Sequence, residues 1–154
     1  MKPALYRFLL TCWLIVWLSM PGAAQTIGGT AQMSKDDRQP ILVSEATRLS
    51  VLSEMRGMLE SIQATLEASG QKNWQAAATA AEKSGLNAFQ KMQATVAKEL
   101  PEAYLTIAGQ AHAAFDKVSK TALDDGRPIT VSAGLAEAMK ICVTCHQTYR
   151  FVLR

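Results

Sequence analysis

The sequence predicts an all-α protein, most simply an antiparallel four-helix bundle, and three observations support this prediction. Apolar residues recur at steps of three and four along four segments that follow Pro40. Short loops, at residues 69–73 and 124–128, separate some of these segments and are rich in glycine and polar residues. Almost no stretch shows the alternation of a half-buried strand. Amphipathic helices joined by short loops pack most simply with neighbours in opposite directions, which predicts an up-down bundle.

The four predicted helices divide the chain after Pro40. The first covers residues 41–68, the second covers 74–98, the third opens at Pro101, and the fourth runs from about residue 130 to the C-terminus. Gly85 lies inside the second helix, where it costs about 1 kcal/mol relative to alanine. The predicted buried stripe of the first helix comprises Leu49, Leu52, Met55, Leu59, Ile62 and Leu66.

Residues 1–24 are predicted to be a cleaved signal peptide. Lys2 and Arg7 precede a run of about 13 mostly apolar residues, and Gly22-Ala23-Ala24 offers a small-residue cleavage site. The run is shorter than the roughly 20 residues that a transmembrane helix needs. The alternative is an uncleaved N-terminal anchor, which leaves the same domain outside the membrane. We therefore expect an exported, periplasmic protein with no stable membrane span unless the signal is retained.

The rest of the chain is predicted to hold one domain, residues 41–154, behind a flexible N-terminal segment, residues 25–40. Without the two basic residues of the signal, 14 Lys and Arg face 13 Asp and Glu, and this balance gives no basis for nucleic-acid binding. No nucleophile–base pair, carboxylate dyad or phosphate-binding loop is evident in the sequence. We therefore expect a binding or carrier protein rather than an enzyme.

The chemistry of the sequence is concentrated in Cys142-Val143-Thr144-Cys145-His146 on the fourth predicted helix. Positions i, i+3 and i+4 share one face of a helix, so Cys142, Cys145 and His146 should project together. Two thiols at this spacing form thioethers with the two vinyl groups of one haem, and the following histidine becomes the proximal iron ligand. The motif thus predicts one covalently attached haem c on the C-terminal helix.

Three other interpretations of this motif are weaker. A redox-active CxxC pair is expected in a thioredoxin-like βαβ context, which an all-helical chain does not offer. Structural zinc normally takes four ligands from paired clusters. Only His112 remains to supplement Cys142, Cys145 and His146. A plain disulfide between Cys142 and Cys145 is the remaining structural alternative.

The position of the motif, nine residues from the C-terminus, resembles that in the cytochrome c-prime family, the class II c-type cytochromes. The resemblance covers residues 41–154, and its most specific part is Cys142-Val-Thr-Cys-His-Gln-Thr-Tyr-Arg150. It implies a four-helix bundle with one haem c in its core, a periplasmic location and frequent homodimers. It also assigns the proximal ligand to His146 and the arginine of the proximal pocket to Arg150, which lies one helical turn further on. The alternative for Arg150 is a solvated cation that offsets the helix dipole.

The sixth coordination position of the iron separates two branches of this family, one with an open distal face and one with a methionine ligand from the first helix. Met55 lies in the middle of the predicted stripe, and Met58 lies on its flank. We expect Met55 to be the distal ligand, while flexible core packing is the alternative role for this side chain. His112 flanks the stripe of the third helix, where we expect it to be half exposed rather than a ligand.

Two functions from different classes follow. The first is an electron carrier that exchanges electrons with redox partner proteins, because His/Met ligation saturates the iron and raises its potential. The second is a five-coordinate haem protein that binds nitric oxide or carbon monoxide at an open distal face. Whether Met55 binds the iron distinguishes these two functions, and we predict the electron carrier.

Overall fold

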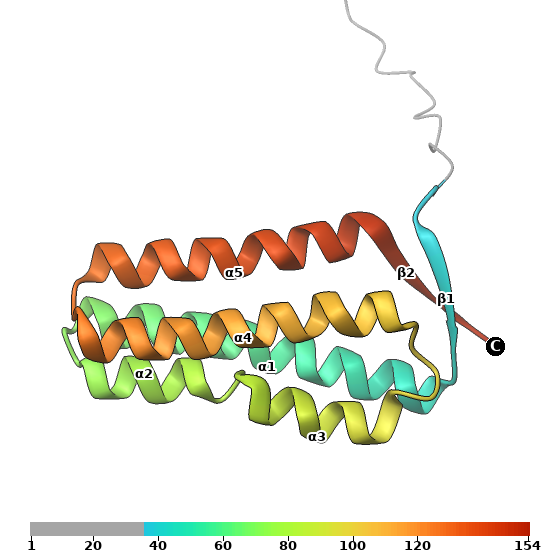
Figure 1. Ribbon diagram of the computed structural model, residues 1–154, viewed down its shortest axis with the longest axis horizontal. Coiled ribbons are helices and arrows are strands. Elements are labelled where there is room, and N and C mark those ends of the chain that lie inside the picture. Colours follow the sequence, from blue (N-terminus) through green and yellow to red (C-terminus); the bar gives the residue numbers. More distant parts are fainter. Residues whose placement is uncertain (1–35) are drawn as a thin grey trace, which may run out of the picture. The chain divides into compact units, whose positions relative to one another are not determined.

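The structure, a computed structural model, describes residues 36–154 and is mostly helical, which confirms the predicted helical class. The predicted signal peptide and residues 25–35 of the predicted N-terminal segment lie outside the described residues. The elements of the described part, in chain order, are β1 (Gln39–Val43), α1 (Glu45–Gly70), α2 (Trp74–Glu82), α3 (Leu86–Val96), α4 (Glu102–Asp124), α5 (Pro128–Thr148) and β2 (Tyr149–Leu153) (Figure 1).

The ends of the first two helices are set by side chains that cap backbone N–H groups. The Ser44 hydroxyl accepts a hydrogen bond from the backbone N–H of Thr47 at 3.2 Å, and Glu45 adds a carboxylate to the first turn of α1. After the turn that follows α1, the Asn73 side chain accepts from the backbone N–H of Ala76 at 3.1 Å and starts α2. These caps explain why the first loop lies where the sequence predicts it.

The predicted second helix is two helices, α2 and α3, which break at Gly85. The carboxylate of Asp116 on α4 accepts a hydrogen bond from the backbone N–H of Leu86 at 3.0 Å and so caps α3. A Cβ atom built on Gly85 would lie only 1.8 Å from the Asp116 side chain. The prediction of one continuous helix over 74–98 was therefore wrong, because only glycine leaves room for this cap.

The helices lie alongside one another, and α2 and α3 follow each other end to end (Figure 1). α4 packs against α2, α3 and α5, and α1 packs against the same three helices. Alanines of α2 that are fully buried, such as Ala77 and Ala81, allow close approach in the core, where Phe115 and Leu135 from α4 and α5 are the large buried side chains.

The two ends of the described chain form a short parallel sheet that the sequence did not predict. β1 pairs with β2 in the register Gln39 with Tyr149 through Val43 with Leu153. The predicted fourth helix was therefore wrong beyond Thr148, where α5 ends. Gln39 and Pro40, predicted to belong to the flexible segment, are the first two residues of β1. Alternate residues of β1 are buried, which is the pattern of a strand with one covered face.

The buried face of α1 differs from the predicted stripe. Leu49, Leu59 and Leu66 are 52%, 66% and 44% exposed, respectively, whereas Val51 and Thr65 are buried. Leu52, Met55 and Ile62 are half-buried. The prediction ranked positions by hydrophobicity, but the close contact with the alanine-rich α2 favours small side chains on α1. Part of the apolar stripe therefore stays on the surface.

α5 is long and apolar enough to meet the length and hydropathy criteria of a membrane-spanning helix, although only 17% of its most apolar window is buried. Glu137 and Lys140 form an ion pair in the middle of this helix. Charged side chains at such a position are costly inside a bilayer. α5 lines the cavity described below, and we attribute part of its low burial to that cavity.

Candidate functional site

α5 brings the three residues of the CxxCH motif to one cavity, as the helical spacing predicts. Cys142 and Cys145 are half-buried, and His146 is exposed at the edge of the cavity. All three side chains line this hollow, which we call the central cavity.

The opposite wall of the central cavity comes from α1. Met55 and Met58 both line it, together with Val51 and Glu54. The thioether of Met55 also lines the adjoining cleft, whereas Met58 packs instead against the core cluster around Phe115. The structure thus brings both methionines of the sequence hypothesis to the side that faces the cysteines. Met55 lies closer to the opening, and Met58 lies closer to the core.

The central cavity continues into a cleft that opens beside the strands. The cavity measures about 60 Å³ and the cleft about 260 Å³. Both are lined by Met55, Tyr104, Cys145 and His146, so the two hollows adjoin each other at these side chains. Small-molecule sites in proteins measure about 300–1,000 Å³, and the two hollows together approach the lower end of that range.

The two thiols are unbonded and have the electrostatics of buried rather than reactive cysteines. Burial raises the pKa of Cys142, and burial followed by the nearby Cys142 sulfur raises the pKa of Cys145. Cysteines that attack disulfides as thiolates have lowered pKa values. The site therefore gives no support to the redox-active CxxC interpretation.

Comparison with protein-family models, with curated proteins and with solved structures gives no match to this chain. Function must therefore be inferred from the chemistry of the site, because a helical fold alone implies no particular function.

Basic residues surround the mouth of the cleft. Arg38, Arg48 and Arg150 all line it. Asp36 forms an ion pair with Arg38 at 2.8 Å and lies 3.7 Å from Arg150, and the Arg38 guanidinium lowers the pKa of Asp36 to about 2. Arg38 also donates to the backbone carbonyl of His146 at 3.2 Å. The mouth of the cleft therefore presents a positive rim directly beside the motif.

Arg150 reaches the site by a different route from the predicted one. It lies on β2, paired with Pro40 of β1, and not one helical turn after His146. Its Nε donates to the backbone carbonyl of Arg38 at 3.3 Å. Because β2 begins directly after the end of α5, Arg150 still lines the same cleft as His146.

His112 is buried, with 1% of its surface exposed, so the expectation of a half-exposed residue was wrong. Its ring lines the central cavity, and its Nδ1 donates to the Ser84 carbonyl at 2.8 Å, since a carbonyl oxygen only accepts. The other ring nitrogen lies 3.9 Å from the Glu54 carboxylate. The break between α2 and α3 exposes the Ser84 carbonyl to this ring. Helical periodicity alone does not predict that break and therefore did not predict the burial of His112.

Sequence reasoning missed Tyr104, Arg38 and Arg48 as site residues. Tyr104 is buried and contacts the rings of Tyr149 and Phe151, with ring centroids 5.7 Å and 5.6 Å away, and burial raises its pKa. The sequence did contain a signal for Arg48, because it lies two helical turns before Met55 and therefore on the same face of the predicted first helix. None existed for Arg38, whose place depends on the unpredicted sheet.

Within residues 36–154, no three His, Cys, Asp or Glu side chains converge as a structural metal site requires. A haem iron takes only one or two ligands from the protein, so this criterion does not address it. The donor set that is present fits haem c better. Two thiols and an imidazole come from one helix, methionines of α1 line the same cavity, and arginines line the adjoining cleft.

Proposed function

We propose that this chain is an exported monohaem c-type cytochrome of the cytochrome c-prime kind, which carries electrons between partner proteins in the periplasm. Its fold is proposed to be an antiparallel four-helix bundle in which α2 and α3 together form one of the four rods. One observation carries the proposal: Cys142, Cys145 and His146 line a single cavity opposite Met55. The apolar, basic-headed N-terminus supports export.

In this proposal each part of the site has a separate task. Cys142 and Cys145 would hold the haem, each through a thioether formed by addition of its S–H across one vinyl group, which needs no oxidant. The imidazole of His146 supplies the proximal ligand. Haem supplies one-electron oxidation and reduction and, where a coordination position is open, binding of small gases.

The remaining residues of the site are proposed to tune the iron and to orient the haem. The thioether of Met55 would be a neutral second ligand to the iron and would favour its ferrous state, which suits an electron carrier. Arg48 and Arg150 are proposed to pair with the propionates, and Tyr104 and Tyr149 wall the opening. The alternative function is a five-coordinate protein that binds nitric oxide or carbon monoxide. The observation that favours it is that Met55 is half-buried and packs against the core cluster of Tyr104, where it can act as a filler.

Covalent attachment is the first prediction to test. Haem-peroxidase staining after denaturing electrophoresis should show haem on the wild-type chain and none on a double variant, Cys142→Ser with Cys145→Ser. Removing the signal-encoded Cys12 by Cys12→Ser provides the matched control, because that thiol should not carry haem. Extraction of the haem from the wild-type protein by acidified acetone would contradict the thioether assignment.

The axial ligand is the second prediction. Met55→Ala should convert the iron from low to high spin in the optical spectrum and let carbon monoxide bind readily. Met58→Ala, a change of the same size one turn later on α1, should leave the spin state unchanged, because Met58 packs against the core. A wild-type ferric protein that is already high-spin and five-coordinate would show that Met55 only packs, and gas binding would then be the better function.

A further inference from the structure

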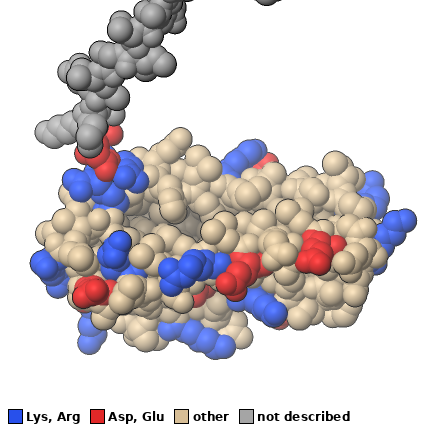
Figure 2. Space-filling model, turned by 180° about the vertical axis from the view of Figure 1, so that it is seen from behind, with Lys and Arg blue, Asp and Glu red and all other residues tan. Residues whose placement is uncertain are grey.

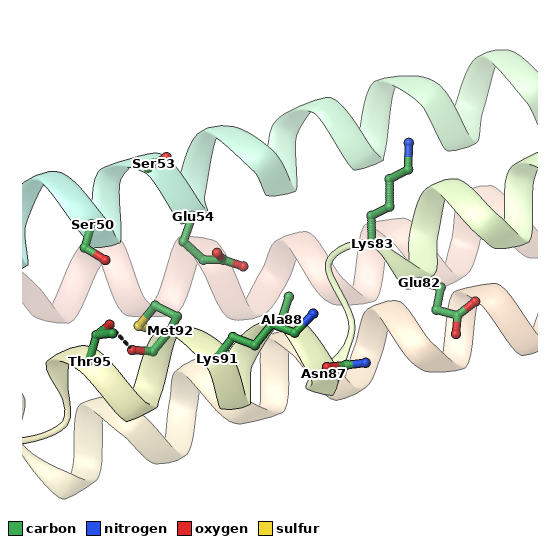
Figure 3. A pocket seen from close by; sticks show the side chains of 10 residues that line it. All are labelled: Ser50, Ser53, Glu54, Glu82, Lys83, Asn87, Ala88, Lys91, Met92 and Thr95. Atoms are coloured by element: carbon green, nitrogen blue, oxygen red, sulfur yellow. Dashed lines mark hydrogen bonds between the residues drawn. The ribbon is translucent and has the colours of Figure 1, made fainter.

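A groove between α1 and α3 adjoins the central cavity on the side of Met55. It measures about 700 Å³, and most of the side chains that line it are polar (Figure 3). The side chains that line it are those of Ser50, Ser53, Glu54, Glu82, Lys83, Asn87, Ala88, Lys91, Met92 and Thr95. Nothing in the proposed function uses this groove.

Two side chains form the partition between this groove and the central cavity. Glu54 and Met92 line both hollows. Figure 3 shows Glu54 extending from α1 and Met92 from α3 into the space between the two helices. Met92 is 8% exposed, and its side chain has three rotatable bonds and a polarizable thioether. The partition is therefore thin, and its α3 half is an easily moved side chain.

Two other hollows that adjoin the central cavity are poorer routes to it. The groove between α4 and α5 meets the cavity at Ile107 and Ile141, which are stiff because both branch at Cβ. The cleft at the arginines contains Cys145 and His146, so an attached haem would fill it. The α1/α3 groove, in contrast, approaches the cavity from the helix that carries Met55, opposite α5 and His146.

We infer that small neutral molecules of the size of carbon monoxide or nitric oxide reach the distal face of the haem through the α1/α3 groove, with Met92 as the moving partition. The inference rests on the proposed function, since it requires a haem in the central cavity. In a chain with Met55 bound to iron, the same route leads to the site that opens when Met55 leaves. The route is polar outside and apolar at the partition, which admits small uncharged molecules.

The test compares two alanines that line different grooves. Ala88 on α3 lines the α1/α3 groove, Ala114 on α4 lines the α4/α5 groove, and both are half-buried. Carbon monoxide rebinding after flash photolysis is measured in the Met55→Ala holoprotein. Adding Ala88→Trp should slow the bimolecular rate about tenfold, because entry then needs a larger displacement. Adding Ala114→Trp should leave it unchanged, and Met92→Ala should raise it.

A second readout does not depend on iron. A crystal of the protein under xenon pressure should bind xenon next to Met92, between the groove and the cavity. Slowing by Ala114→Trp but not by Ala88→Trp, or equal rates in both variants, would overturn the route, as would failure of the Met55→Ala holoprotein to bind carbon monoxide. A chain without attached haem would refute the proposed function. In that case the presence or absence of xenon at Met92 would still decide whether the passage exists.

Discussion

His112 lies at the back of the central cavity, between the Ser84 carbonyl and the Glu54 carboxylate. Its Nδ1 proton satisfies a carbonyl that the break between α2 and α3 leaves free, and its ring packs on Phe89 with centroids 5.2 Å apart. A buried carbonyl that loses its donor costs about 1–3 kcal/mol. These contacts give His112 a structural role inside the cavity that holds the proposed haem.

His112→Ala should therefore lower the free energy of unfolding by about 1–3 kcal/mol and leave the spin state of the iron unchanged. Chemical denaturation measures the first effect, and the optical spectrum of the folded protein measures the second. His112→Gln, which retains an N–H donor, should recover part of the lost stability. A change from low to high spin in His112→Ala with the fold intact would show instead that His112 is an iron ligand.

At the scale of single residues, the sequence predicted that the residues of the CxxCH motif lie together, but it predicted the burial of other side chains less well. Cys142, Cys145 and His146 share a face because their spacing in a helix dictates it, and this required no knowledge of the fold. His112 and the leucines of α1 were misplaced because their burial depends on which neighbour packs against them. Alanines on α2 and the break at Gly85 decide that packing, and periodicity within α1 or α4 carries no information about either.

Among the elements, the parallel strand pair has the most direct connection to the site. Arg38, directly before β1, lies next to the His146 carbonyl, and β2 holds Arg150 beside the same cleft. Ile41 and Val43 of β1 are buried in the cluster that contains Tyr104, while Leu42 between them is 58% exposed. The pair therefore joins the end of α5 to the core at the mouth of the cleft.

Ile41→Ala should lower the free energy of unfolding by about 2–5 kcal/mol, since it leaves a cavity in this cluster. The neighbouring Leu42→Ala should change it by no more than about 0.5 kcal/mol, because that side chain is on the surface. Denaturant titration of both variants measures the difference. Equal effects of the two substitutions would mean that β1 does not dock in the register described.

Sequence analysis missed the pairing of β1 with β2, because parallel strands of five residues that lie far apart in the sequence carry no local turn signal.

At the scale of the whole molecule, the exposed leucines of α1 need a partner, and we propose a second copy of this chain. Leu59 and Leu66 are 66% and 44% exposed and lie seven residues apart, as in a helix–helix seam. Arg56 precedes Glu60 and Glu67 along the same helix, so two copies that pack antiparallel bring opposite charges together. Figure 2 shows a broad uncharged area on this side of the molecule, bordered by a row of basic and acidic groups.

The last prediction concerns this face. Sedimentation analysis should find a dimer of the wild-type protein, and Leu59→Lys should raise its dissociation constant by about tenfold or more, which corresponds to about 1.4 kcal/mol. Leu123→Lys is the matched control, because Leu123 on α4 is 54% exposed but lies outside the seam, and the dimer should persist. Arg56→Glu should weaken the dimer through like charges, and combining it with Glu60→Arg should restore it, which loss of folding would not. A monomeric wild-type protein at micromolar concentration, or equal effects of Leu59→Lys and Leu123→Lys, would rule out this interface.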